Sequence, residues 1–318
     1  MPLYRNALPQ LDGSLFLTDA GLETDLIFNH GIELRGFASH TVLPDPAAMA
    51  VVTRYFEGFL ALARELDAGF ILDTLTWRTH PHFAAEVGDT PAQLKAATER
   101  AVAYAAELRE RAGNPRPVVL NAVTGPCGDA YRPEIRISAD QAERYYAEQI
   151  GWVAHSEIDM YSALTFTQAS EATGLVRAAR AAGLPVAVSF TVETDGRLPD
   201  GQPLGEAIEQ VDAETGGETA YFMVNCAHPD HFADALTGDW TRRIRGVRAN
   251  ASRRSHAELD EAPELDTGNP HELGRLYAEL LERLPWLNVF GGCCGSDLRH
   301  VTSIARSIGG TKPLTTVA

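Results

Sequence analysis

Long apolar runs, positive charge and cysteine are all scarce in this sequence. No stretch approaches the ~18 consecutive apolar residues of a membrane-spanning helix, and residues 1–10 carry no apolar core of signal-peptide length. Lys and Arg number 27 against 43 Asp and Glu, for a net charge of -16. This deficit argues against nucleic acid or an anionic membrane surface as a partner, because both are bound by clustered cations. Four cysteines in 318 residues fit a reducing compartment better than a disulfide framework, so we expect a cytoplasmic protein.

Apolar segments of strand length alternate with helical segments along the chain, whose composition is 45% hydrophobic and 22% charged, as in ordinary globular proteins. The links from helix to strand are short, whereas several loops from strand to helix are long. This alternation predicts an α/β fold, a single (β/α)8 TIM barrel domain over residues 1–318, with a doubly wound open sheet as the main competitor. The eight strands are expected at residues 15–19, 69–74, 117–122, 159–165, 185–190, 221–225, 244–249 and 287–290.

Capping residues mark where several helices begin. Asp45 stands before Pro46, a pairing of N-cap and first-turn proline that is typical of a helix start. Ser138 and Gln141 have the spacing of a capping box. Ser296 is expected to cap the last helix.

A glycine-rich turn near the C-terminus, Gly291-Gly292-Cys293-Cys294-Gly295, carries two adjacent cysteines. The glycines give the backbone the freedom that both thiols need to reach one metal ion. Cys226 follows the strand expected at residues 221–225, so all three thiols should lie on loops of one face. Three thiolates predict a zinc site whose fourth position is open. The alternative is that the pair is part of the core, although glycine is unfavourable inside a packed strand.

The remaining cysteine, Cys127, is expected to be a loop or core residue and not a ligand.

Closure of the barrel predicts the position of Asp19. It places the first strand beside the eighth, so Asp19 at the end of the first strand should lie near Cys293 and Cys294. An open sheet would not require this neighbourhood.

A zinc site with three thiolate ligands favours one kind of chemistry. Such a site is a weak Lewis acid, but it can hold a fourth thiol as a nucleophilic thiolate, whereas a free thiol is mostly protonated at neutral pH. Transfer of a small electrophilic group onto a substrate thiol is therefore expected. The rivals are a zinc lyase or hydrolase that uses metal-bound water, for which the usual His and Glu signatures are missing, and a metal-binding protein without catalysis.

The motifs resemble those of the homocysteine S-methyltransferase family of zinc barrels, over nearly the whole chain. The resemblance rests on Asn225-Cys226 with Gly291-Gly292-Cys293-Cys294-Gly295, and is supported by Asp19-Ala20-Gly21-Leu22-Glu23-Thr24 and Thr74-Leu75-Thr76-Trp77. It implies zinc held by Cys226, Cys293 and Cys294, and methyl transfer to homocysteine to give methionine. The donor in the family is S-methylmethionine, S-adenosylmethionine, betaine or a folate. By the same resemblance Asp19 holds the substrate amino group and Thr76 contacts substrate. Asp19 and Asn225 are the candidate catalytic residues, and Asn225 is expected either to orient Cys226 or to ligate zinc.

One position departs from the family. Members that bind homocysteine carry Phe-Glu-Thr after the fourth strand, and that glutamate contacts the amino group, whereas this chain has Leu164 there. Either Asp19, Glu23 or Asp25 compensates, or the substrate is a different small thiol. We expect homocysteine with altered recognition.

Overall fold

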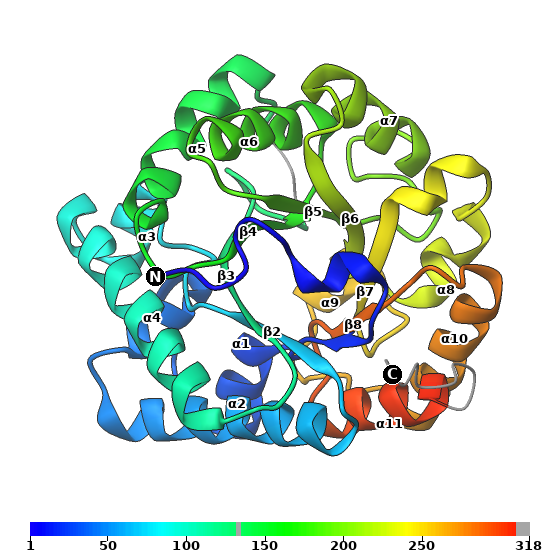
Figure 1. Ribbon diagram of the computed structural model, residues 1–318, viewed down its shortest axis with the longest axis horizontal. Helices are drawn as coiled ribbons and strands as arrows, with labels where there is room; N and C mark the ends of the chain where they lie inside the picture. Colours follow the sequence, from blue (N-terminus) through cyan, green and yellow to red (C-terminus); the bar gives the residue numbers. More distant parts are fainter. Residues whose placement is uncertain (132–134, 310–318) are drawn as a thin grey trace.

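Eight parallel strands close into a barrel in the computed structural model, which describes residues 1–131 and 135–309 (Figure 1). The strands follow one another in sequence order, and β1 pairs with β8 through Phe16 beside Val289 and Leu17 beside Phe290. This closure confirms the predicted TIM barrel and excludes the open sheet. In the described part of the chain, no helix has the length and apolar character needed to cross a membrane.

The strand ends differ from the predicted ends by no more than two residues. Their bounds are β1 Phe16–Leu17, β2 Gly69–Asp73, β3 Val118–Thr124, β4 Met160–Phe166, β5 Val186–Phe190, β6 Thr219–Asn225, β7 Ile244–Ala249 and β8 Val289–Gly292.

The shift of β8 corrects one argument made from the sequence. Gly291 and Gly292 are strand residues, although glycine was expected to be unfavourable inside a packed strand. The reason is the close approach of β1. A Cβ atom on Gly291 would collide with Oγ1 of Thr18 and lie 2.6 Å from the carbonyl oxygen of Asp19. Only glycine fits at this point of the seam that closes the barrel.

Helices surround the barrel (Figure 1). Their bounds are α1 Leu22–Thr24, α2 Pro46–Glu65, α3 Ala84–Val87, α4 Pro91–Ala112, α5 Ala139–Val153, α6 Ala169–Ala181, α7 Leu204–Thr215, α8 Pro229–Phe232, α9 His256–Asp260, α10 Pro270–Arg283 and α11 Leu298–Gly309. The predicted cap of α2 by Asp45 and the capping box at Ser138 are both present.

The predicted cap of the last helix is wrong. α11 begins at Leu298, and Asp297 accepts a hydrogen bond at 2.9 Å from the amide of Arg299 in its first turn. Ser296 instead donates its hydroxyl to the carbonyl of Cys293 at 2.6 Å. Ser296 therefore stabilises the cysteine turn and does not start the helix.

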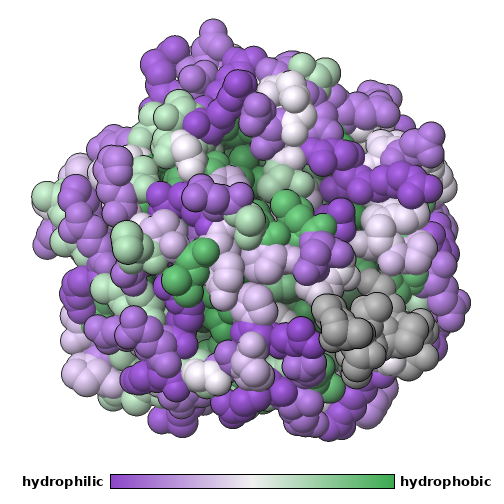
Figure 2. Space-filling view, viewed as in Figure 1, coloured by the Kyte–Doolittle hydropathy of each residue, from purple (hydrophilic) through white to green (hydrophobic). Residues whose placement is uncertain are grey.

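Apolar side chains fill both the barrel interior and the layer between strands and helices. The interior holds residues such as Phe16, Val119, Met160 and Tyr221, all at most 1% exposed. The N-terminal segment lies across one end of the barrel (Figure 1), where the amides of Leu3 and Tyr4 donate to Asp159. The opposite, C-terminal end is left for the loops that carry the cysteines. The face shown in Figure 2 is largely hydrophilic, with apolar residues in separate patches.

Candidate active site and metal centre

Three cysteine sulfurs meet at the C-terminal end of the barrel. Cys226 follows β6, and Cys293 and Cys294 follow β8, so that their Sγ atoms all lie within 4.8 Å of one another. The Sγ atoms of Cys226 and Cys294 are 3.9 Å apart. Cys127 is 3% exposed and is not part of this group; its amide donates to Glu171 at 2.6 Å. The structure thus brings together the three cysteines predicted from the sequence and leaves out the fourth.

Cys226 and Cys293 are joined by a disulfide. This bond is a departure from the expectation that the cysteines would be free thiols, and it follows from the meeting of the ends of β6 and β8. A disulfide and a pair of metal-bound thiolates are alternative states of the same two sulfurs, because only the thiolate binds metal. The form that could hold a metal is therefore the reduced one.

The backbone of Cys226 is held in an uncommon conformation. Its φ of 53° is in the left-handed region, which costs a non-glycine residue about 1–3 kcal/mol. Its carbonyl oxygen accepts hydrogen bonds from Oγ1 of Thr191 at 3.2 Å and Nδ2 of Asn250 at 3.1 Å, and lies 2.7 Å from Nε2 of His256. The other ring nitrogen of His256 lies 3.1 Å from Glu193. These contacts offset the strain and fix the direction of the thiol.

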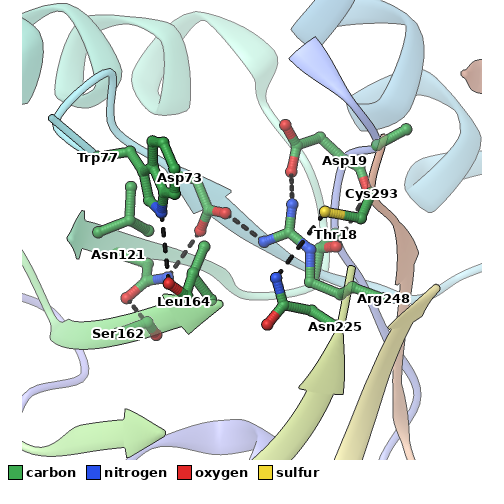
Figure 3. A network of polar contacts seen from close by, with 12 residues as sticks. Thr18, Asp19, Asp73, Trp77, Asn121, Ser162, Leu164, Asn225, Arg248 and Cys293 are labelled. Atoms are coloured by element: carbon green, nitrogen blue, oxygen red, sulfur yellow. Dashed lines mark hydrogen bonds and ion pairs between the residues drawn. The ribbon is translucent and has the colours of Figure 1, made fainter. Parts of the chain in front are cut away.

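Asn225 connects two strands beneath the cysteines. Its Oδ1 accepts from the amide of Thr165 at 2.9 Å, and its Nδ2 donates to Oγ1 of the same residue at 2.8 Å. Thr165 also has a positive φ, of 65°. Nδ2 of Asn225 lies 3.8 Å from Sγ of Cys293 (Figure 3). Asn225 was expected to orient Cys226 or to ligate zinc, and the sulfur that its side chain contacts is instead that of Cys293.

A network of charged groups crosses the floor of the site (Figure 3). Arg248, at the end of β7, donates to Asp73, to Asp19 at 2.5 Å and to the carbonyl of Gly292 at 3.3 Å. Burial raises the pKa of Asp19 to about 7, although Arg248 opposes the shift. Burial by itself would lower the pKa of Arg248, but the negative charges of Asp73 and Asp19 have the larger combined effect. The pKa of Arg248 is therefore raised. Asp19 lies beside the cysteines, as barrel closure predicted, since its carbonyl accepts from Gly292 at 3.0 Å.

A cavity of about 560 Å³ opens above this floor and is lined by the three cysteines. Asp19, Glu23, Leu164 and Asn225 also line it, as expected of site residues. Thr76 does not line it; the side chain is 1% exposed and bonds to Thr74 and the carbonyl of Val123.

Asp25 lies outside this cavity. It lines a separate hollow with His30 and Arg54, and accepts a hydrogen bond from Asn29 at 2.8 Å. The structure therefore does not bring Asp25 to the site as a partner for the substrate amino group.

Comparison with known protein families agrees with the closed barrel and its group of three cysteines. A model of the homocysteine S-methyltransferase family matches residues 16–308. The chain belongs to this family. It is an enzyme family that methylates thiols. No curated protein sequence matches the chain.

Solved structures of another methyltransferase share the fold. The oxidized form of the homocysteine methyltransferase MmuM from Escherichia coli is 20% identical, with a TM-score of 0.70 over 94% of this chain and 98% of that one. The metallated form is 18% identical, with a TM-score of 0.69 over 95% and 98%. At this identity the likeness concerns the fold alone.

The thiol of Cys294 is a poor nucleophile in the absence of a metal. Burial raises the pKa of Cys294 to about 11, with a smaller opposing effect of a hydrogen bond from Tyr131. At neutral pH this thiol is protonated unless a cation replaces the proton. A cluster of three cysteine sulfurs, once all are reduced, is an arrangement that a soft divalent metal stabilises.

The sequence missed several residues that shape the site. Arg248, His256, Asn250 and Thr191 carry no motif of their own. Arg248 and Asn250 lie at the C-terminal end of β7, where TIM barrels place functional residues. Their position at a predicted strand end could have identified them from the sequence.

Proposed function

We propose that this chain is a zinc-dependent S-methyltransferase that moves a methyl group from a sulfonium or ammonium donor to the thiol of homocysteine, giving methionine. The observation that carries the proposal is the group of three cysteine sulfurs within 4.8 Å at the wall of an open cavity.

The three sulfurs fit zinc better than other common metals. Thiolate ligands select soft or borderline ions, and three of them leave a tetrahedral zinc ion one position for a substrate. When bound, zinc would hold the substrate thiol as its thiolate at neutral pH. Cys226, Cys293 and Cys294 would be the ligands. Asn225 and the groups that bind the carbonyl of Cys226 would keep their sulfurs in place.

The lining of the cavity favours a cationic methyl donor over a folate. Eight carboxyl residues line it against two arginines, and Arg248 is already paired with Asp19 and Asp73. The second arginine, Arg78, is paired with Glu86 at 3.2 Å. A sulfonium or quaternary ammonium is attracted both to acids and to aromatic faces, whereas the carboxylates of a folate would be repelled. The aromatic residues are Phe28, Phe37, Phe56, Trp77 and Tyr131.

Direct attack of the substrate thiolate on the donor carbon needs only two oriented reactants. The cavity has room for both at once, since about 560 Å³ lies within the range of sites for drug-sized ligands. A donor with a chiral methyl group should therefore give product of inverted configuration. Net retention would require a methylated enzyme intermediate instead.

The test is a set of methylation assays on the reduced, zinc-loaded protein. Homocysteine is incubated separately with S-methylmethionine, S-adenosylmethionine, betaine and a methylfolate, and methionine is measured by mass spectrometry. We expect methionine from one or more of the three cationic donors and none from the folate. Methionine formed from the folate alone would refute the donor assignment, and no methylated thiol with any donor would refute the proposed function.

A further inference from the structure

Residues 252–266, between β7 and α10, form a closed loop beside the cavity. The two ends of the loop meet, because Oγ of Ser252 donates to Oδ2 of Asp266 at 2.6 Å. Just outside these ends, Gly268 packs so closely on Ala251 that a Cβ atom would lie 2.1 Å from the Ala251 carbonyl oxygen. The loop contains α9 and contributes to the cavity wall Leu259, Asp260, Ala262, Glu264 and Leu265. A long connection whose ends are joined in this way is an Ω-loop, a kind of segment that is often functional.

One side chain of this loop reaches the group of cysteines. His256, the first residue of α9, is only 4% exposed. A carbonyl oxygen can only accept, so Nε2 of His256 donates to the carbonyl of Cys226, at 2.7 Å. The other ring nitrogen lies 3.1 Å from Oε1 of Glu193. The face of the ring stacks on Tyr131, with ring centres 4.2 Å apart and planes 7° from parallel. The imidazole is therefore fixed at both nitrogens and on one face.

The backbone of Cys226 depends on contacts of this kind. A left-handed φ such as its 53° persists only where the surroundings hold it in place, and a change of φ would redirect the thiol. Thr191 and Asn250 also donate to the Cys226 carbonyl, at 3.2 and 3.1 Å, and they directly follow strands β5 and β7. Of the three contacts, that of His256 is the shortest and the only one made by the loop. Opening of the loop would therefore remove the closest contact of this carbonyl.

We propose that His256 is a positioning residue that couples the loop of residues 252–266 to the metal ligand Cys226. With the loop docked, His256 holds Cys226 in the direction that brings its sulfur to those of Cys293 and Cys294. With the loop open, this contact is lost and the affinity for the metal falls. Coupling of two equilibria is reciprocal, so metal binding also favours the docked loop and thereby orders one wall of the cavity. The inference rests on the proposed zinc site and adds to it a means of shaping the cavity.

The first test is the zinc affinity of the reduced protein, measured by competition with a chromophoric chelator. His256→Phe keeps a ring to stack on Tyr131 but has no donor, and should bind zinc about tenfold more weakly than wild type. His256→Gln, whose amide supplies a donor at similar reach, should retain most of the affinity. The control is His271→Phe, the same change at an exposed position of α10, which should bind zinc as wild type does. Equal affinities in wild type and His256→Phe would overturn the inference.

The second test is amide hydrogen exchange in α9 of the reduced wild-type protein, with and without zinc, and it applies even if His256→Phe does not fold. Reciprocity predicts that zinc slows this exchange by the same factor of about ten, since local exchange reports local opening. In His256→Phe, zinc should leave exchange in α9 unchanged. The comparison within the protein is α3, another short helix at the cavity, where zinc should have no such effect.

Exchange in α9 that is unaffected by zinc, or slowed equally in α9 and α3, would overturn the coupling. Reduced wild-type protein that binds no zinc would overturn both this inference and the proposed function. Zinc-loaded wild type that methylates no thiol would refute the proposed function alone, because neither test here depends on methyl transfer.

Discussion

Replacement of Asn225 by alanine tests whether the positions of the cysteines depend on this one amide. The substitution removes two hydrogen bonds to Thr165, at 2.9 and 2.8 Å, and the contact with Cys293 at 3.8 Å. Asn225 is 2% exposed and Thr165 4% exposed, so water has little access to the groups left behind.

The expected loss of stability follows from these contacts. An unpaired buried amide costs about 1–3 kcal/mol, and a lost neutral hydrogen bond about 0.5–1.5 kcal/mol. Asn225→Ala should therefore lower the free energy of unfolding by roughly 2–4 kcal/mol. Thr165→Val removes only the hydroxyl and should cost about 1 kcal/mol. Zinc affinity should fall about tenfold to a hundredfold in Asn225→Ala, because a group that orients a ligand is lost.

The measurement is urea unfolding of the reduced, metal-free variants, followed by circular dichroism, with zinc affinity from competition with a chromophoric chelator. A loss below about 0.5 kcal/mol, within the range of surface substitutions, would refute the reasoning. So would equal losses in Asn225→Ala and Thr165→Val.

Three further outcomes follow from the structure. Gly291→Ala should destabilise the protein by about 1–3 kcal/mol or more in thermal unfolding, because β1 leaves no room for a Cβ atom. The control is Gly151→Ala on α5, where a Cβ atom meets open space and should stabilise the protein by about 0.5–1 kcal/mol. An unchanged stability in Gly291→Ala would contradict the close packing of β1 against β8. Burial lowers the pKa of His80 to about 4, so its neutral form contributes stability that is complete above pH ~6.5 and is lost as the pH falls toward 4. Urea unfolding at pH 7 and 5 should show a smaller loss in His80→Gln than in wild type, and equal losses would count against this origin. Cys127→Ala should keep its full zinc content by elemental analysis, and loss of the metal would show that the ligand set is wrong.

The fold was predictable because its signals are local. Strand-length apolar segments, capping residues such as Asp45 and Ser138, and glycines at turns act over a few residues each. The cysteine pair was informative because the glycines beside it allow both thiols to turn toward one point, and Cys226 follows a strand that ends on the same face. Barrel closure then placed Asp19 beside them without any contact being known.

The rest of the site depends on contacts that no local pattern records. Arg248 pairs with Asp73 and Asp19, which are 175 and 229 residues away in the sequence. Nothing in the sequence next to Arg248 indicates these ion pairs. Asp25 was chosen for its nearness in sequence to Asp19, yet the helical turns after β1 direct it to a different hollow. Thr76 belongs to a motif but faces a neighbouring strand.

Zinc content of the reduced protein and of its cysteine variants tests the central claim most directly. The claim is that Cys226, Cys293 and Cys294 together hold the metal that activates the thiol. It predicts stoichiometric zinc in the wild type, measured by elemental analysis after removal of loosely bound metal, and loss of zinc in each of the three single Cys→Ser variants. Full retention of zinc in Cys294→Ser would contradict it.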